Sequence, residues 1–288
     1  MEKIAIVTDS SCDASDAELA EMGVVCVHLN VQKADGTPFP EDNSSENIEA
    51  FYDYISECKD LPSTSCPPPT AFSQVYSKLA DEGFTHIISL HMPHAMSATV
   101  DVAGIAAKES PLPVDVIDTQ CNTVGQYLFV RRVAQLRNAG ATRAELLEAI
   151  EELIGKTSVC FMLDTLKCLV KGGRTGKAVG LAATLLNIKP LLTVDPTGEV
   201  DMFGKTKSVK RAASKLADHY LKLQDKFGPL ECCFVHTRNL PGVNLLREAL
   251  LERNVDLLEV GVRQAGPVIT THVCTGCFGF AYIPRATV

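Results

Sequence analysis

Short apolar runs rich in β-branched residues alternate with amphipathic segments through the first half of the chain. Runs of this length bounded by polar turns are typical of buried strands, whereas apolar residues spaced three and four apart indicate helices. The pattern predicts strands over residues 3–8, 24–31, 85–91 and 114–118. It predicts helices over residues 47–58, 71–81, 100–108, 124–138 and 141–154. Regular alternation of strand and helix favours an α/β fold.

Polar turns follow three of the predicted strands, at residues 9–13, 92–99 and 119–123. The carboxyl ends of parallel strands meet at one edge of a sheet, so these hydroxyl-rich turns should collect there. We therefore expect a doubly wound, mostly parallel sheet with a ligand site at that edge. None of the turns has the glycine spacing of a dinucleotide-binding motif or a P-loop, which argues against both types of nucleotide site.

The pattern in the second half of the chain predicts a separate set of strands and helices. They are strands over residues 158–163, 189–194, 199–203, 231–236, 257–262, 268–273 and 278–283, with helices over 208–222 and 243–253. The acidic helix over residues 141–154 closes the first set. We therefore expect two α/β domains, residues 1–156 with the doubly wound sheet and residues 157–288 as an α/β sandwich.

Residues 161–192 contain a cluster of basic residues followed by a long uncharged stretch. Lys167, Lys171, Arg174 and Lys177 surround a glycine pair, and no charged residue follows from residue 178 to residue 188. A helix in the uncharged part would be apolar on almost every side, and its N-terminus would attract an anion. The segment is thus either a buried core helix after a solvated basic loop or a site for an amphiphile with a negative head. The exposed basic groups could also attract an acidic partner protein.

The 288 residues are 46% hydrophobic and carry a formal net charge of −8, which indicates a globular protein with a full core. A negative chain without an overall basic face makes nucleic acid an unexpected partner. No apolar run approaches the length of a transmembrane segment, and the chain opens directly into a strand pattern rather than a secretory signal. These features predict a cytoplasmic protein.

Eleven cysteines are scattered along the chain. An odd number without a secretory signal argues for reduced thiols and against a disulfide framework. Cys274 and Cys277 form a CxxC pair, but a lone pair without ligand histidines at metal spacing is a weak indication of a redox or zinc site. We therefore expect no metal and no cofactor.

Several segments taken together resemble the DegV family of bacterial fatty-acid-binding proteins. The matching segments are VTDSS at residues 7–11, TSCP at 64–67, SAT at 97–99, VIDT at 116–119, LVKGGRTGKA with LLNIKPLL at 169–192, and GPVITTHVCTGCFG at 266–279. Each segment alone is a weak signal, but together they follow the family order over essentially the whole chain. The resemblance implies two α/β domains that hold a long-chain fatty acid between and within them.

The resemblance also implies a role and a partner. Family members resemble the acyl-carrying subunit of a bacterial fatty acid kinase, which presents the carboxylate to a separate ATP-binding subunit for conversion to acyl phosphate. On this basis the protein would be non-catalytic and would act in phospholipid metabolism.

The head-group residues implied by the resemblance are Thr64, Ser97, Arg174 and His272. A hydroxyl, a guanidinium and an imidazole are suitable donors for a carboxylate. The serine pair that the family usually has before the SGT segment is replaced by Pro93 and His94, and His94 could donate to the carboxylate instead. The acyl chain would lie in a tunnel whose walls include Val179, Leu181, Leu185, Leu186 and Ile188.

Two alternative functions stay open at this point. The first is a small-molecule enzyme related in fold to the dihydroxyacetone kinases, although the sequence has no G-x-S-x-G nucleophile motif and no nucleotide loop. The second is binding of a different anionic amphiphile, which the replacement of the serine pair by Pro93 and His94 would allow.

Overall fold

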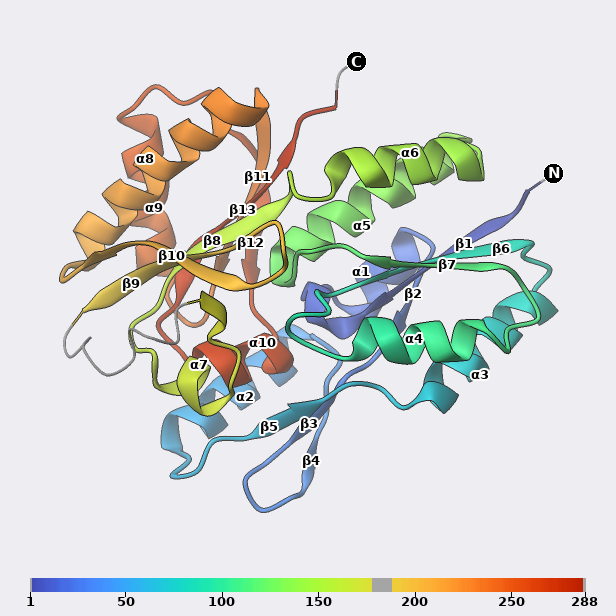
Figure 1. Ribbon diagram of the computed structural model, residues 1–288. Helices are drawn as coiled ribbons and strands as arrows, with labels where there is room; N and C mark the ends of the chain where they lie inside the picture. Colours follow the sequence, from blue (N-terminus) through green and yellow to red (C-terminus); the bar gives the residue numbers. More distant parts are fainter. Residues whose placement is uncertain (1, 178–187, 287–288) are drawn as a thin grey trace.

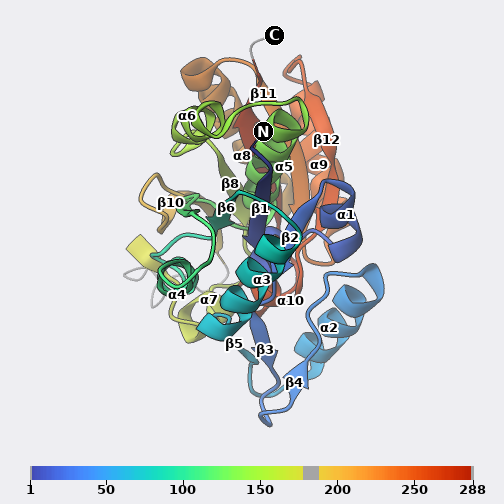
Figure 2. The same ribbon diagram turned by 90° about the vertical axis from the view of Figure 1, so that its right-hand side faces the viewer.

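The computed structural model describes residues 2–177 and 188–286 and contains three sheets (Figures 1 and 2). The first sheet is parallel throughout and has the order β2-β1-β6-β7. Its strands are β1 (Ile4–Asp9), β2 (Val24–Val27), β6 (His86–His91) and β7 (Val114–Asp118). The strand order reverses direction between β1 and β6, which is the topological switch point of a doubly wound sheet. The predicted parallel sheet is confirmed.

Helices cover both faces of this parallel sheet. One face packs against α3 (Pro69–Asp81) and α4 (Thr99–Ala107) through Val7, Phe72, Tyr76 and Ala103. The other face packs against α1 (Asp16–Glu21) and α5 (Thr123–Asn138), with α6 (Arg143–Leu153) beyond. Because both faces are buried, the strands are apolar at successive positions rather than at alternate ones.

The second sheet is mixed and has the order β10-β9-β8-β13-β11-β12, in which only β11 and β12 are parallel. Its strands are β8 (Ser158–Met162), β9 (Lys189–Val194), β10 (Val200–Thr206), β11 (Leu230–His236), β12 (Leu258–Gln264) and β13 (Phe278–Pro284). Successive side chains of a strand face opposite sides. Cys160 and Met162 therefore pack beneath α8 (Val209–Phe227) and α9 (Leu240–Leu251), whereas Val159 and Phe161 face α5.

Helix α5 lies between the two large sheets, and one hydrophobic core runs from β1 through α5 to β8 and β13 (Figure 1). An ion pair also joins α5 to the mixed sheet, between Arg131 and Glu231 at 3.1 Å. The fold class is confirmed, because mixed α/β architecture with one parallel and one mixed sheet is present. The boundary between residues 156 and 157 stays a prediction.

A small third sheet with the order β4-β3-β5 extends from the base of the molecule next to α2 (Ser45–Glu57) (Figure 2). It consists of β3 (Asn30–Gln32), β4 (Pro38–Phe39) and β5 (Ser63–Ser65). The strand predicted over residues 24–31 is therefore wrong in its extent, since β2 and β3 belong to different sheets. Two short helices, η1 (Ser10–Cys12) and α7 (Lys167–Lys171), follow β1 and β8.

Residues 267–273 form the helix α10 (Pro267–Val273), where the sequence predicted a strand. Pro267 occupies the first helical turn, where its missing N–H is not needed and its fixed φ suits a helix. The segment is buried on nearly all sides, so its apolar run carries no periodicity that separates helix from strand. Figure 1 shows α10 beside α7, close to the third sheet.

Candidate functional site

A largely apolar cleft lies between the carboxyl edge of the parallel sheet and the mixed sheet. It comprises about 610 Å³ of space that no protein atom occupies, part of it open to solvent. The lining residues are Leu29, Thr64, Ser65, Cys66, Met92, Met96, Ser97, Asn122, Phe161, Leu169, Arg174, Val194, Val200, Val268, Ile269, His272 and Val273. Polar groups are few and apolar side chains from both halves of the chain dominate, as in typical small-molecule sites.

A second, smaller cavity of about 360 Å³ adjoins the cleft. It shares Asn122, Phe161, Ile269 and Val273 with the cleft and is otherwise lined mainly by Val159, Val235, Ala265 and Cys277. Phe161 of β8 and the apolar side of α10 therefore form part of the wall of both cavities.

The polar end of the cleft is built around a hydrogen bond between Thr64 and His272. Thr64 Oγ1 lies 2.9 Å from His272 Nε2 and joins β5 to α10, although 208 residues separate the two in sequence. Burial, with a contribution from the positive charge of Arg174, lowers the pKa of His272 to about 4. The imidazole is therefore neutral at neutral pH. If Nε2 carries its proton, His272 donates to Thr64 and leaves the Thr64 hydroxyl free to donate to a ligand.

Gly172 allows the backbone after α7 to approach His272 closely. A Cβ atom added at Gly172 would lie 2.3 Å from His272 Nδ1, which no side chain could tolerate. The His272 Nδ1 atom is buried and has no hydrogen-bond partner among the described residues. Gly172 of the basic turn thus makes room for the His272 ring.

Arg174 lies at the rim of the cleft with its side chain exposed. Its Nη1 donates to the Gly172 carbonyl at 2.7 Å, and its Nε donates to the Met96 carbonyl at 3.2 Å. In the part of the chain that the structure describes, no carboxylate pairs with it. Backbone carbonyls hold the guanidinium in place and leave its charge available to a carboxylate ligand.

Ser97 lines the cleft, whereas His94 does not. Ser97 Oγ lies 2.8 Å from Thr99 Oγ1. His94 is exposed, and its Nδ1 lies 3.0 Å from Asp101 of α4. The His94 ring therefore has an acidic partner on the surface, and its place in the head-group site stays a prediction.

The predicted tunnel residues are mostly outside the described residues, since Val179, Leu181, Leu185 and Leu186 lie between residues 178 and 187. Ile188 is described; it is half-buried immediately before β9 and is not among the residues that line the cleft. Among the described residues, the apolar wall comes from Met92, Phe161, Ile269 and their neighbours. Sequence reasoning missed these residues because Phe161 and Ile269 belong to ordinary buried runs and Met92 begins a turn. The part of the four undescribed residues in the tunnel stays a prediction.

Comparison with known proteins places this geometry in a family. Residues 3–285 match the family described as "Uncharacterised protein, DegV family". A DegV domain-containing protein of Deinococcus radiodurans is 35% identical over 283 residues, which cover 98% of each chain. The chain belongs to the DegV family.

Two DegV relatives have names or descriptions that mention fatty acids. The chain is 29% identical to a fatty acid-binding protein of Thermotoga maritima over 96% of each chain. It also resembles the solved structure of a DegV family protein of Thermus thermophilus described by its fatty acid binding. That similarity has a TM-score of 0.89 at 29% identity and covers 98% of this chain and 100% of the other.

Two of the four basic residues of the DegV glycine turn are neutralised within the protein. Lys171 Nζ lies 3.4 Å from Asp60, and Lys177 contacts Asp195 and lies 3.7 Å from Glu199. Arg174 is the member that lines the cleft, and a docking role for the four exposed basic residues stays a prediction.

Sequence reasoning missed a buried chain of hydrogen bonds behind the VTDSS turn. His91 joins Asp9 at 3.0 Å and Ser89 at 2.7 Å, and Ser89 continues to Tyr76 at 2.9 Å. Burial alone would raise the pKa of Asp9, but hydrogen bonds from His91 and Ser11 hold it below its usual value. Ser89, His91 and Asp9 follow one another as in a Ser-His-Asp triad, but all three side chains are fully buried. Their hydrogen bonds therefore connect β1 to β6 at the switch point of the sheet.

Cys168 of α7 and Cys274 after α10 lie next to each other, with Cα atoms 5.8 Å apart, a separation that a disulfide can bridge. Such a bond would join the two helices that present Arg174 and His272. Cys277, the other member of the CxxC pair, is a separate buried thiol. The expectation that the cysteines are reduced stays a prediction.

No helix of the described chain is long and apolar enough to cross a membrane.

Proposed function

We propose that the protein binds a long-chain fatty acid, with the acyl chain in the apolar cleft and the carboxylate beside Thr64, Arg174 and His272. The observation that supports this is the pairing of one polar, cationic rim with an apolar cleft that adjoins a second cavity. A carboxylate with a long hydrocarbon chain has the same division into a charged end and an apolar body. The fatty acid binding of DegV relatives supports the same ligand.

Most of the affinity comes from the hydrocarbon chain. Burial of each methylene contributes about 0.8 kcal/mol, so about ten buried methylenes contribute roughly 8 kcal/mol before the entropic cost of binding. The hydrogen bonds at the rim set the orientation of the ligand. They hold the carboxylate at the open end of the cleft, next to exposed Arg174.

The protein itself is proposed to be non-catalytic and to present the carboxylate to the ATP-binding subunit of a fatty acid kinase in the cytoplasm. The open rim supports this role, since a partner could reach a carboxylate held there. The purified protein with ATP alone should form no acyl phosphate, whereas addition of such a kinase subunit should produce it. Acyl phosphate from the protein alone would contradict the non-catalytic role.

Native mass spectrometry of the purified protein, followed by denaturation and identification of released molecules, tests the ligand. One long-chain fatty acid per chain is the expected result. A stoichiometric amphiphile with a different anionic head would instead favour the second candidate, which is motivated by Pro93 and His94 in place of the usual serine pair. Absence of any lipid, together with no binding of added fatty acid, would overturn the proposal.

A further inference from the structure

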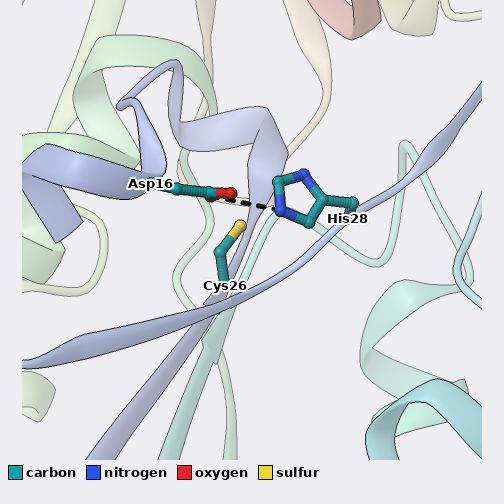
Figure 3. Close-up of side chains that lie close together, drawn as sticks. All are labelled: Asp16, Cys26 and His28. Atoms are coloured by element: carbon teal, nitrogen blue, oxygen red, sulfur yellow. Dashed lines mark ion pairs between the residues drawn. The ribbon is translucent and has the colours of Figure 1, made fainter. Parts of the chain in front are cut away.

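Three potential metal ligands converge on the surface of the N-terminal half, outside the lipid cleft. They are Asp16, the first residue of α1, Cys26 of β2, and His28 in the link between β2 and β3 (Figure 3). Their ligand atoms all lie within 4.8 Å of one another, and His28 Nε2 lies 3.1 Å from Asp16 Oδ1. None of the three lines the cleft.

The second nitrogen of His28 is held by a buried carboxylate. His28 Nδ1 lies 3.3 Å from Glu41 Oε2, and the Glu41 side chain is only 3% exposed. A metal-bound histidine almost always donates its other N–H to such a carboxylate, which fixes the tautomer and turns the free nitrogen toward the metal. Glu41 thus keeps a proton on Nδ1 and directs Nε2 toward Asp16 and Cys26.

Only one oxygen of Glu41 contacts the histidine. Oε2 lies beside His28 Nδ1, whereas Oε1 is buried and has no hydrogen-bond partner among residues 2–177 and 188–286. The carboxylate is thus held inside the protein and presents one oxygen to the ring.

We propose that Asp16, Cys26 and His28 form a zinc site, with a carboxylate oxygen, a thiolate and the imidazole Nε2 as ligands and water as the fourth. This combination of nitrogen, sulfur and oxygen ligands suits Zn²⁺, whereas Mg²⁺ and Ca²⁺ take oxygen ligands alone. The Asp16 and His28 side chains are 57% and 36% exposed, so the fourth position is open to water.

The spacing of the three side chains needs only a small adjustment. Zn–N, Zn–O and Zn–S bonds of about 2.0–2.3 Å in a tetrahedron place the ligand atoms roughly 3.3–3.8 Å apart. The observed atoms are within 4.8 Å of one another, so the most widely spaced pair has to close by at most roughly 1–1.5 Å.

Binding replaces protons with the metal. Without metal, hydrogen bonds and charge from Glu41 and Asp16 raise the pKa of His28 to about 9, so the imidazolium bridges the two carboxylates. Burial raises the pKa of the Cys26 thiol, which is therefore protonated. Zn²⁺ would displace the Nε2 proton of His28 and the Sγ proton of Cys26 and would leave the Nδ1–H of His28 on Glu41. Each metal ion bound releases two protons.

A metal here would fix the geometry of the link between β2 and β3. His28 is followed by Leu29, which lines the lipid cleft. The site would therefore join the start of α1 to a segment that shapes the wall of the cleft, as a structural rather than a catalytic site.

The test is titration of the chelator-treated full chain with Co²⁺ as a spectroscopic probe, followed by displacement with Zn²⁺. One Co²⁺ per chain is expected, with tetrahedral d–d bands and a thiolate-to-cobalt charge-transfer band that Zn²⁺ abolishes. Cys26→Ser should remove the charge-transfer band, and His28→Gln should abolish tetrahedral binding. Glu41→Gln should weaken Zn²⁺ affinity about 10- to 100-fold, as is usual when a partner of a ligand histidine is lost.

Two control variants match these changes. Cys58→Ser removes a half-buried thiol that lies outside the proposed site. Asp101→Asn alters a different exposed His-Asp pair, the one with His94. Both variants should bind Co²⁺ and Zn²⁺ as the wild type does. Circular dichroism of each variant checks that it is folded. Absence of saturable binding by the wild type would overturn the proposal, as would a charge-transfer band that persists in Cys26→Ser or binding unchanged in His28→Gln. Binding by the wild type that Glu41→Gln does not alter would refute the assigned orientation of His28.

Discussion

At the rim of the cleft, the Thr64 hydroxyl is one of the neutral donors available to the proposed carboxylate. Thr64→Val removes the hydroxyl but preserves the branched shape, so β5 should form unchanged. A hydrogen bond to a charged group contributes about 1.5–3 kcal/mol, so fatty acid affinity should fall about 10- to 100-fold in a fluorescence displacement titration. Ser63→Ala is the matched control, since Ser63 is exposed on the same strand. Equal affinities of Thr64→Val and the wild type would remove Thr64 from the head-group site.

The depressed pKa of His272 makes stability depend on pH. The pKa of His272 is about 4 in the folded protein and about 6.5 in an unfolded chain. The unfolded state therefore binds the proton more tightly, and stability present above pH 6.5 is lost as the pH falls toward 4. His272→Gln should lose less stability than the wild type over this range, with a difference of at most about 3 kcal/mol.

Urea unfolding of both proteins at several pH values between 4 and 7 measures this difference. The comparison cancels contributions of other groups, such as buried Asp13, whose pKa burial raises to about 7. His94→Gln serves as the control, because His94 is exposed. Parallel pH profiles for the wild type and His272→Gln would show that His272 is not protected from protonation.

At the scale of elements, the separation of Cys168 and Cys274 predicts a disulfide that joins α7 to α10 across 106 residues of sequence. Thiol titration of the unfolded chain should give nine thiols without reductant and eleven after reduction. Reduction should lower the free energy of unfolding by up to about 4–5 kcal/mol, since long loops lose the most entropy on closure. Cys168→Ser should abolish this sensitivity to reductant, whereas Cys58→Ser should retain it. Eleven thiols in the oxidised sample would contradict the pairing.

At the scale of the whole molecule, the halves are joined through α5 and the mixed sheet. Arg132 of α5 is buried and contacts Glu231 of β11, which also pairs with Arg131. Glu231→Gln leaves a buried positive charge without its counter-charge, which typically costs about 3 kcal/mol or more. Glu259→Gln, which alters a more exposed pair with Arg247, should cost less than about 1 kcal/mol. Calorimetric unfolding measures both, and similar losses in the two variants would argue against α5 as the main junction.

The sequence by itself determined the parallel sheet, its covering helices and most of the mixed sheet. These elements rest on local signals: β-branched apolar runs, helical spacing, and polar turns after strands. The resemblance to the DegV family placed Thr64, Ser97, Arg174 and His272 among the candidates, because the family motifs that contain them are contiguous in sequence.

Only the tertiary structure decided how distant residues meet. Thr64 joins His272 across 208 residues, Cys168 lies next to Cys274 across 106, and Glu41 supports His28 from another loop. Helix α10 was mistaken for a strand because a segment buried on nearly all sides has no periodic pattern. His94 lies beside Asp101, a surface partner that no local motif reveals. Contacts of this kind depend on how distant elements pack together. Such packing produces no regular spacing of residue types in the sequence, so the sequence alone does not predict these contacts.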